Sequence, residues 1–261
     1  MVIIAVVIIA VVMMKYSNHS RKLPFLEFRV KMKSKSVLII DYGVGNIFNI
    51  KRAFESLGGA VSVSNDISAI NKAERIVLPG VGAFAAGMAG LREHNLIEPL
   101  KEAALVRKIP FLGVCLGMQL LMESSEENGN WQGLGFIQGT VKRLTPHTNE
   151  NTPEQTAQQG INEHKIPHMG WNTLEKPLKN DHPAQERSIL AGISFPEYFY
   201  FVHSYHVTPL HQEVCIAETS YGGQRFCSAI TSHNLSGCQF HPERSGEAGL
   251  RILRNFLYEI V

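Results

Sequence analysis

The chain contains, at residues 109–122, the sequence Ile-Pro-Phe-Leu-Gly-Val-Cys-Leu-Gly-Met-Gln-Leu-Leu-Met. Cys115 stands between Gly113 and Gly117 at the end of an apolar run, a pattern that is typical of a nucleophile elbow, in which a strand ends, the chain turns sharply and a helix begins. The glycines allow the tight turn and a close approach of neighbouring backbone, and the positive end of the helix favours the thiolate. A buried structural cysteine is the alternative interpretation of this segment.

A histidine and a glutamate near the C-terminal end are the expected partners of that cysteine. Residues 236–243 read Ser-Gly-Cys-Gln-Phe-His-Pro-Glu, a strand-like stretch that ends in His241 and Glu243. In extended backbone, positions two apart project from the same side, so Glu243 is expected to orient the imidazole of His241. With Cys115, they supply the nucleophile, base and orienting group of a catalytic triad. A lone histidine is more often structural, and the coincidence of these patterns favours catalysis.

A glycine-rich loop offers backbone donors for the same site. An apolar run at 76–78 leads through Pro-Gly-Val-Gly at 79–82 into a helical stretch. Because glycine frees the backbone, N–H groups of this loop can point into a cavity beside the nucleophile and form an oxyanion hole. An ordinary turn between a strand and a helix is the alternative.

Alternating strands and helices are predicted from residue 37 onward. Apolar runs at 37–40, 60–64, 76–78 and 111–114 are typical of buried strands, and helical spacing predicts helices at 47–57, 83–94 and 96–108. This alternation predicts an α/β fold, a doubly wound and mostly parallel sheet with helices on both faces. Asp41, Gly80 and Cys115 each come just after a strand, so their loops are expected to meet at one rim.

The second half of the chain predicts an added, smaller β region. Short β-like segments occur at 141–144, 168–174, 198–203, 214–217 and 226–230. A final helix at 245–258 is expected to bury Leu250, Leu253 and Leu257. The polar stretch at 145–163 is expected to be an exposed loop.

The N-terminal segment does not match the rest of the chain. Residues 2–14 are all apolar, but they are fewer than the roughly 20 residues that a membrane helix needs. No basic segment precedes them and no clear cleavage site follows. A weak membrane anchor, a tail with an unrecognised role and an unused upstream start codon are the possible interpretations, and the last is favoured. We therefore expect residues 1–31 to lie outside the fold and residues 36–261 to form the functional domain.

Composition excludes several classes of protein. The chain has 261 residues and a net charge of +2, and its basic residues are scattered except around Lys15 to Lys35, so nucleic acid is not an expected partner. The four cysteines, at 115, 215, 227 and 238, show no paired metal-ligand spacing, and neither a metal nor a cofactor is expected. A free catalytic thiol fits a reducing, cytoplasmic location, and no membrane is expected as a partner. The other three cysteines are expected only to pack.

These motifs together resemble a known family. Gly113-x-Cys115-x-Gly117-x-Gln119 with His241-Pro242-Glu243 is similar to the class I, or triad, glutamine amidotransferases, over residues 37–261. Three further segments resemble the glutaminase subunits of imidazole glycerol phosphate synthases: Asp-Tyr-Gly-Val-Gly-Asn at 41–46, Pro-His-Met-Gly-Trp-Asn at 167–172 and Tyr-Phe-Val-His-Ser-Tyr at 200–205.

The resemblance implies a glutaminase mechanism. The Cys115 thiolate would attack the carboxamide of glutamine, His241 would protonate the departing ammonia, and Glu243 would hold the imidazole. The oxyanion would be met by the N–H groups of Leu116 and Val81. Contacts to glutamine are implied for Gly80, Gly82, Gln119, Glu127, Ser204 and Tyr205. From the residues alone, each has an alternative to a glutamine contact: Gln119 could lie on an exposed helix face, and Glu127 could belong to a solvated acidic run.

The resemblance also implies a partner. In the family, ammonia passes to a cyclase subunit, a (β/α)₈ barrel, which makes imidazole glycerol phosphate and an aminoimidazole carboxamide ribotide in histidine biosynthesis. The expected contacts in this heterodimer are Asn46, Trp171, Tyr200 and Arg244. A core position is the alternative for Trp171. The competing functions are a glutaminase of pyridoxal phosphate or purine nucleotide synthesis, a non-catalytic subunit and a cysteine peptidase.

Overall fold

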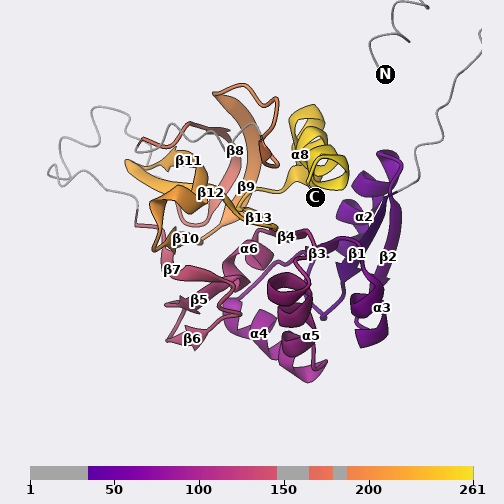
Figure 1. Cartoon of the computed structure of the whole chain (residues 1–261). Coiled ribbons are helices and arrows are strands. Elements are labelled where there is room, and N and C mark those ends of the chain that lie inside the picture. Colours follow the sequence, from indigo (N-terminus) through magenta and orange to yellow (C-terminus); the bar gives the residue numbers. More distant parts are fainter. Residues whose placement is uncertain (1–34, 146–164, 179–186, 261) are drawn as a thin grey trace, which may run out of the picture. The chain divides into compact units, whose positions relative to one another are not determined.

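The apolar segments of the sequence form the parallel half of a large sheet, as Figure 1 shows. The structure is a computed structural model, and it describes residues 35–145, 165–178 and 187–260. The parallel strands are, in spatial order, β2 (Ala60–Ser64), β1 (Ser36–Ile40), β3 (Ile76–Leu78), β4 (Phe111–Val114) and β13 (Leu235–Cys238). The chain leaves β1 toward β2 and then returns to β3 on the other side of β1. This order is doubly wound, and ligands bind outside the carboxyl ends of strands at such a reversal.

Helices cover both faces of this parallel half. One face carries α2 (Ile47–Ser56) and α8 (Gly246–Tyr258), and the other carries α3 (Ile67–Lys72), α4 (Phe84–Glu93), α5 (Ile97–Lys101) and α6 (Leu116–Leu120). Alternate residues of β1 enter the two cores, because successive side chains of a strand point to opposite faces. Leu38 packs with the α3–α6 core and Ile39 with the α2–α8 core.

The other half of the structure is made of mixed and antiparallel β structure. Beyond β13 the sheet continues through β12 (Gln224–Ser232), β10 (Tyr205–Pro209), β7 (Ile137–Arg143), β5 (Met122–Ser125) and β6 (Trp131–Gln132), with β11 (Cys215–Tyr221) also paired to β12. A separate antiparallel pair consists of β8 (His168–Leu174) and β9 (Glu197–His203). The predicted α/β class with an added smaller β region is confirmed.

Three details differ from the sequence prediction. The helix expected at 96–108 is divided into α5 and a π-helix, Glu102–Val106. The short helix α3 and strands β5, β6 and β10 were not predicted, because they are brief and carry weak periodicity. In α8, Leu250 is only half-buried, and Phe256 is fully buried beside the expected Leu253 and Leu257.

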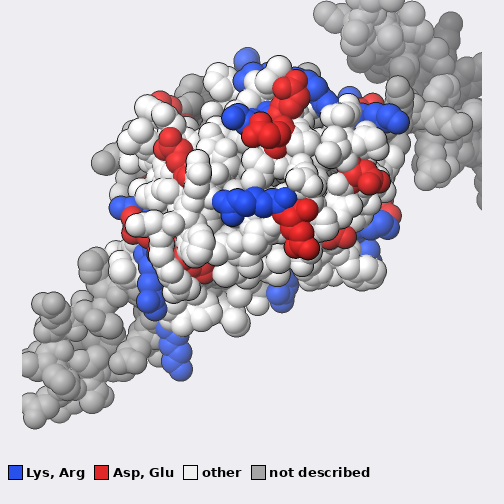
Figure 2. Space-filling model, turned by 90° about the horizontal axis from the view of Figure 1, so that it is seen from below, with Lys and Arg blue, Asp and Glu red and all other residues white. Residues whose placement is uncertain are grey.

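Two predictions concern parts of the chain that the structure does not describe. The N-terminal extension, 1–31, lies outside the described residues, as does the polar loop at 145–163 apart from Thr145. The described residues all belong to one unit by their mutual contacts. No helix among the described residues has the length and apolarity that crossing a bilayer requires. On the face shown in Figure 2, basic and acidic side chains are interspersed, and large areas carry neither.

Candidate active site

The sequence around Cys115 forms the expected elbow between β4 and α6. Cys115 has φ +53° and ψ −109°, a sparsely populated conformation that a non-glycine residue keeps only where its surroundings impose it. Its backbone N–H donates to the carbonyl of Cys238 on β13 at 2.8 Å. A Cβ at Gly117 would collide with the carbonyl oxygen of Leu78, so only glycine allows this approach of α6 to β3.

The loops after β1, β3 and β4 meet at the carboxyl edge of the sheet, as predicted. Burial raises the pKa of Tyr42, so its hydroxyl stays protonated, and it donates to the carbonyl of Pro79 at 2.6 Å. The backbone N–H of Leu116 donates to the carbonyl of Gly80 at 3.3 Å. The glycine-rich loop is therefore anchored from both sides beside the elbow.

His241 and Glu243 form a buried pair behind Cys115. His241 Nδ1 lies 2.8 Å from Glu243 Oε1, and the two side chains are only 6% and 3% exposed. The extended geometry expected for this pair is wrong, because a 3₁₀ turn, Pro242–Arg244, follows His241. The turn brings the carboxylate back to the ring. Ser245 Oγ stabilises it by donating to the carbonyl of His241 at 2.7 Å.

The surroundings of His241 favour its protonated form. Burial acts to lower the pKa of His241, but interactions with Cys115 and with the Glu243 carboxylate outweigh it and raise the pKa to about 10. The buried Nε2 atom has no hydrogen-bond partner of ordinary geometry among the described residues. Both observations fit a sulfur that faces Nε2 without a fully formed hydrogen bond. His241 is thus held as an acid, ready to give a proton on the side of Cys115.

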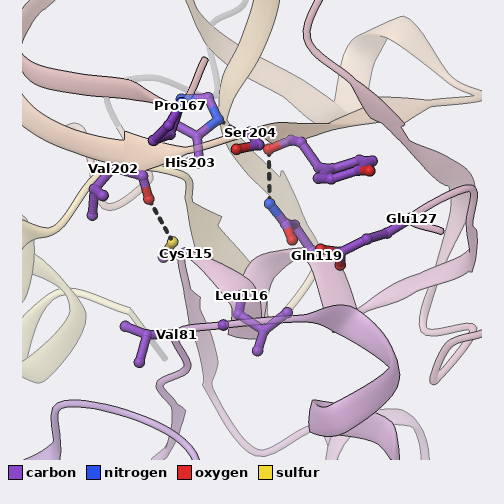
Figure 3. A pocket seen from close by; sticks show the side chains of 11 residues that line it. Val81, Cys115, Leu116, Gln119, Glu127, Pro167, Val202, His203 and Ser204 are labelled. Carbon is purple, nitrogen blue, oxygen red and sulfur yellow. Dashed lines mark hydrogen bonds between the residues drawn. The ribbon is translucent and has the colours of Figure 1, made fainter.

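Cys115 opens into a pocket of about 310 Å³, shown in Figure 3. The size suits a small molecule. The sulfur lies 3.9 Å from the carbonyl oxygen of Val202. The pocket is lined by Val81, Gly82, Cys115, Leu116, Gln119, Glu127, Pro167, Val202, His203, Ser204 and Tyr205. All the expected glutamine contacts are among these residues except Gly80, which lines a much smaller cavity together with His241 and Glu243.

Two polar side chains, Gln119 and Glu127, line this pocket. Their surroundings exclude the alternative that each simply faces solvent. Gln119 is 5% exposed, and its Nε2 atom donates to the carbonyl of Tyr205 at 2.8 Å, so it does not lie on an exposed helix face. Glu127 is half-buried, and its carboxylate accepts the N–H of Phe84 at 2.6 Å at the start of α4. The fully solvated interpretation of Glu127 is therefore wrong, although the neighbouring Glu126 is exposed.

Comparison with known proteins identifies the family of this chain. The family model "Glutamine amidotransferase class-I" matches residues 38–260. The chain belongs to the class I glutamine amidotransferases. The amidotransferase is 42% identical over 222 residues to imidazole glycerol phosphate synthase subunit HisH 1 of Legionella pneumophila (strain Lens), a match that covers 85% of this chain and 98% of that protein.

A second relative supports this assignment, and a solved structure supports the fold. The amidotransferase is 42% identical over 226 residues to imidazole glycerol phosphate synthase subunit HisH of Lactococcus lactis subsp. lactis (strain IL1403), covering 87% of this chain and 100% of that protein. The solved structure of PurLQS from Thermotoga maritima is similar with a TM-score of 0.61 at 18% identity, over 86% of this chain and 98% of that one. The structural likeness supports the fold.

One of the two expected oxyanion donors of the amidotransferase is already engaged. The Leu116 N–H points at the Gly80 carbonyl, so a carbonyl oxygen rather than a free donor stands beside the nucleophile. Val81 is 41% exposed and lines both the main pocket and the small cavity beside His241. In this state the Leu116 N–H is therefore not free to bind an oxyanion.

Three of the four expected contact residues of the amidotransferase lie close together, and Asn46 is exposed at the start of α2. Trp171 on β8 is 57% exposed, so the alternative of a core tryptophan is wrong. It pairs in register with Tyr200 on β9, and their ring centroids are 6.2 Å apart. The guanidinium of Arg244 lies 4.0 Å from the centroid of the Tyr200 ring. Asn46 is exposed, and its side chain caps α2 by accepting from the N–H of Asn49 at 3.5 Å.

Several residues at the site were not identified from the sequence. Gln239 donates from Nε2 to the sulfur of Cys115 at 3.7 Å and accepts from Gln119 at 3.2 Å. His203 lines the pocket and is bonded to His168. Both histidines lie inside motif segments, but no local pattern indicates that β8 and β9 pair. Among the described residues, no cluster of three or more His, Cys, Asp or Glu side chains is arranged to hold a metal ion.

Proposed function

We propose that this amidotransferase hydrolyses glutamine at Cys115 and delivers the ammonia to the cyclase subunit of an imidazole glycerol phosphate synthase. The observation that carries the proposal is the arrangement of Cys115 at the floor of a small-molecule pocket, with a buried His241–Glu243 pair on its other side. The high identity to HisH subunits along most of the chain supports the choice of synthase.

The reaction follows from these positions. The Cys115 thiolate attacks the side-chain carboxamide carbon of glutamine, and the carbon–nitrogen bond breaks as His241 gives its proton to the leaving ammonia. Glu243 keeps the imidazole in its orientation throughout. Water, deprotonated by His241, then attacks the glutamyl thioester, releases glutamate and restores the thiolate.

The pocket residues bind the glutamine. Gln119, Glu127, Ser204, Tyr205 and Gly82 surround the space in front of the sulfur and hold the amino acid with its carboxamide toward Cys115. Fixing the reacting atoms in this way removes much of the entropic part of the barrier.

Docking of the cyclase completes the oxyanion hole. We propose that the Gly80–Val81 peptide rotates on docking, which moves the Gly80 carbonyl away from Leu116 and turns the Val81 N–H toward the sulfur. The Leu116–Gly80 hydrogen bond in the undocked state supports this proposal. One oxyanion donor contributes about 10²–10³ in rate, so hydrolysis stays slow until the partner is present.

The surface formed by Trp171, Tyr200, Arg244 and Asn46 binds the cyclase, a (β/α)₈ barrel, in a heterodimer. Large aromatic side chains that are exposed in the free protein commonly anchor interfaces. Arg244 directly follows Glu243 in the same 3₁₀ turn, so a partner that binds Arg244 can shift the position of Glu243. Gly80 lines the small cavity that also contains Asn46 and His241, and it stays among the proposed glutamine contacts.

The ring-forming chemistry belongs to the partner. In the complete reaction, glutamine and a ribulosyl aminoimidazole carboxamide nucleotide give glutamate, imidazole glycerol phosphate and an aminoimidazole carboxamide ribotide, a step of histidine biosynthesis. We place the enzyme in the cytoplasm, where a free catalytic thiol stays reduced.

Glutamate release by the purified chain, alone and with the cyclase and its nucleotide ligand, tests the proposal. We expect hydrolysis to rise by roughly 10²-fold or more in the complex. In Cys115→Ser, hydrolysis should fall by roughly 10³-fold or more while binding to the cyclase persists. Equal rates with and without the cyclase would contradict the docking step. A failure to supply ammonia to the added cyclase would favour another amidotransferase.

A further inference from the structure

Two buried histidines outside the triad lie between the β8–β9 pair and the glutamine pocket. His168 on β8 and His203 on β9 are 2% and 5% exposed, and they are opposite each other in the register of the strands. The ring of His168 stacks on Phe201 and on Tyr221, with centroids 4.8 Å and 4.1 Å away. The ring of His203 in turn lies 5.7 Å from that of Phe201 and 5.0 Å from that of Phe226, centroid to centroid, so both imidazoles have little freedom to turn.

Backbone carbonyls at both ends of this pair fix where its protons lie. His203 Nδ1 is 2.9 Å from the carbonyl oxygen of Tyr205, which only accepts, so His203 carries its proton on Nδ1. At the other end, the amide nitrogen of Asn172 donates to the Ser220 carbonyl at 3.0 Å and lies 3.2 Å from His168 Nε2. His168 Nε2 is therefore an acceptor.

The two assignments agree at the contact between the rings. His168 Nδ1 is 3.0 Å from His203 Nε2, so His168 donates from Nδ1 and His203 accepts at Nε2. Both rings are then neutral and in a single tautomer. Burial, followed by the proximity of His168, lowers the pKa of His203 to about 3, which agrees with the neutral form at physiological pH.

The pair ends on a carbonyl that also controls Gln119. The Tyr205 oxygen accepts a second hydrogen bond from Gln119 Nε2 at 2.8 Å, shown as a dashed line in Figure 3. The other Nε2 hydrogen goes to Gln239 Oε1 at 3.2 Å. With both hydrogens committed, Gln119 offers the pocket its carbonyl oxygen, an acceptor, and no donor.

We propose that His203, held in one tautomer by His168, is a positioning residue that fixes the Tyr205 carbonyl and, through it, the orientation of the Gln119 amide. The pocket then presents an acceptor that suits a ligand with N–H donors, such as glutamine, and disfavours a bare carboxylate such as glutamate. The inference rests on the proposed function in that it takes glutamine as the substrate.

Two substitutions at one position separate the hydrogen bond from packing. The amide nitrogen of asparagine takes the place of Nδ1, so His203→Asn can keep the bond to Tyr205, whereas the longer His203→Gln places its amide near Nε2 and loses that bond. His206→Gln is the matched control. His206 is also buried, and it makes the same kind of Nδ1 contact, 3.0 Å to the Val207 carbonyl, without a bond to a pocket residue.

The test measures kcat and KM for glutamine in the complex with the cyclase. In His203→Gln we expect KM to rise about tenfold, the effect of one lost buried hydrogen bond, with kcat within about twofold of the parent. His203→Asn should stay within about threefold in KM, and His206→Gln should leave KM unchanged. Equal KM values for the two His203 variants, or an equal rise in His206→Gln, would overturn the proposal.

Nitrogen-15 NMR of the unsubstituted full chain tests the same inference if the variants do not fold. We expect His168 and His203 to be protonated at Nδ1 only, and we expect His203 not to titrate between pH 5 and pH 8, roughly the interval over which an ordinary histidine titrates. A proton on Nε2 of either ring would contradict the assignment. Absence of glutaminase activity in the unsubstituted complex would instead count against the proposed function, so the two failures are distinguishable.

Discussion

At the residue scale, the chemistry depends on charges that are held close together out of water. The pKa of His241 is raised because the Glu243 carboxylate and Cys115 lie beside a ring that burial alone would keep neutral. The orienting bond is made across a 3₁₀ turn, with both side chains nearly inaccessible. A single change at Glu243 therefore acts on the protonation of His241 rather than on the nucleophile itself.

Replacing Glu243 by glutamine should lower the pKa of His241 from about 10. Because the pKa of His241 is higher in the folded state than the ordinary 6.5, protonation of His241 stabilises the folded state. This stabilisation is complete below pH 6.5 and is lost as the pH rises through about 10. Glu243→Gln should thus be destabilised relative to the parent at pH 6 and less so near pH 10. Denaturant unfolding at both pH values measures this. An equal difference at the two pH values would contradict the ion-pair account.

At the element scale, the β8–β9 pair places aromatic side chains on one surface and the paired histidines on the other. The period of two along each strand explains this division, because Trp171 and Tyr200 project outward while His168 and His203 project inward. The same two strands thus serve the proposed docking surface and the pocket wall.

Trp171→Ala should weaken binding to the cyclase by about 2 kcal/mol or more, the loss typical of a central aromatic anchor. The thermal midpoint should change little, because the side chain is largely exposed. Titration calorimetry measures the affinity. Leu210→Ala is a suitable control, since Leu210 is 65% exposed and lies outside the proposed docking surface. An equal loss of cyclase affinity in Trp171→Ala and Leu210→Ala would contradict the assignment of Trp171 to the docking surface.

The last helix, α8, closes one face of the parallel sheet. Phe256 is fully buried, and its ring is 6.1 Å from that of Phe54 on α2, centroid to centroid. Phe256→Ala should reduce the free energy of unfolding by about 3–5 kcal/mol, from lost burial and the cavity left behind. Arg254→Ala, on the exposed side of the same helix, should change it by less than about 0.5 kcal/mol. Urea unfolding of the two variants gives the comparison, and similar losses would contradict the packing described.

At the scale of the whole molecule, the parallel half was predictable, whereas in the mixed half most strands were predicted but their pairing partners were not. The strands near 37–40, 60–64 and 76–78 follow from short apolar runs, and the elbow at Cys115 from its glycines. The pairing of β8 with β9, and the continuation of the sheet from β13 to β6, join segments that are far apart in sequence. No local pattern specifies such partners, so the His168–His203 pair and Gln239 were missed.

In the candidate site, too, local sequence predicted some features, and others depend on contacts between distant segments. Gln119 and Glu127 were expected at the glutamine pocket only through family resemblance, and their burial became evident from packing against β10 and α4. The 3₁₀ turn after His241 was missed because proline is compatible with both an extended and a turned chain.

A chain that starts at Met32 should fold and act like the full chain. We propose residues 36–261 as the functional domain, and all the described residues belong to one unit. The thermal midpoint and the glutaminase activity with the cyclase should match those of the full chain. A truncated chain that aggregates, or that fails to be activated, would show that residues 1–31 contribute to the domain.

The covalent intermediate tests the central claim most directly. During turnover with glutamine in the cyclase complex, acid quenching and peptide mass spectrometry should reveal one glutamyl group attached to Cys115, and none in Cys115→Ser. Glutamate formation without this adduct, at a rate that Cys115→Ser leaves unchanged, would contradict the account.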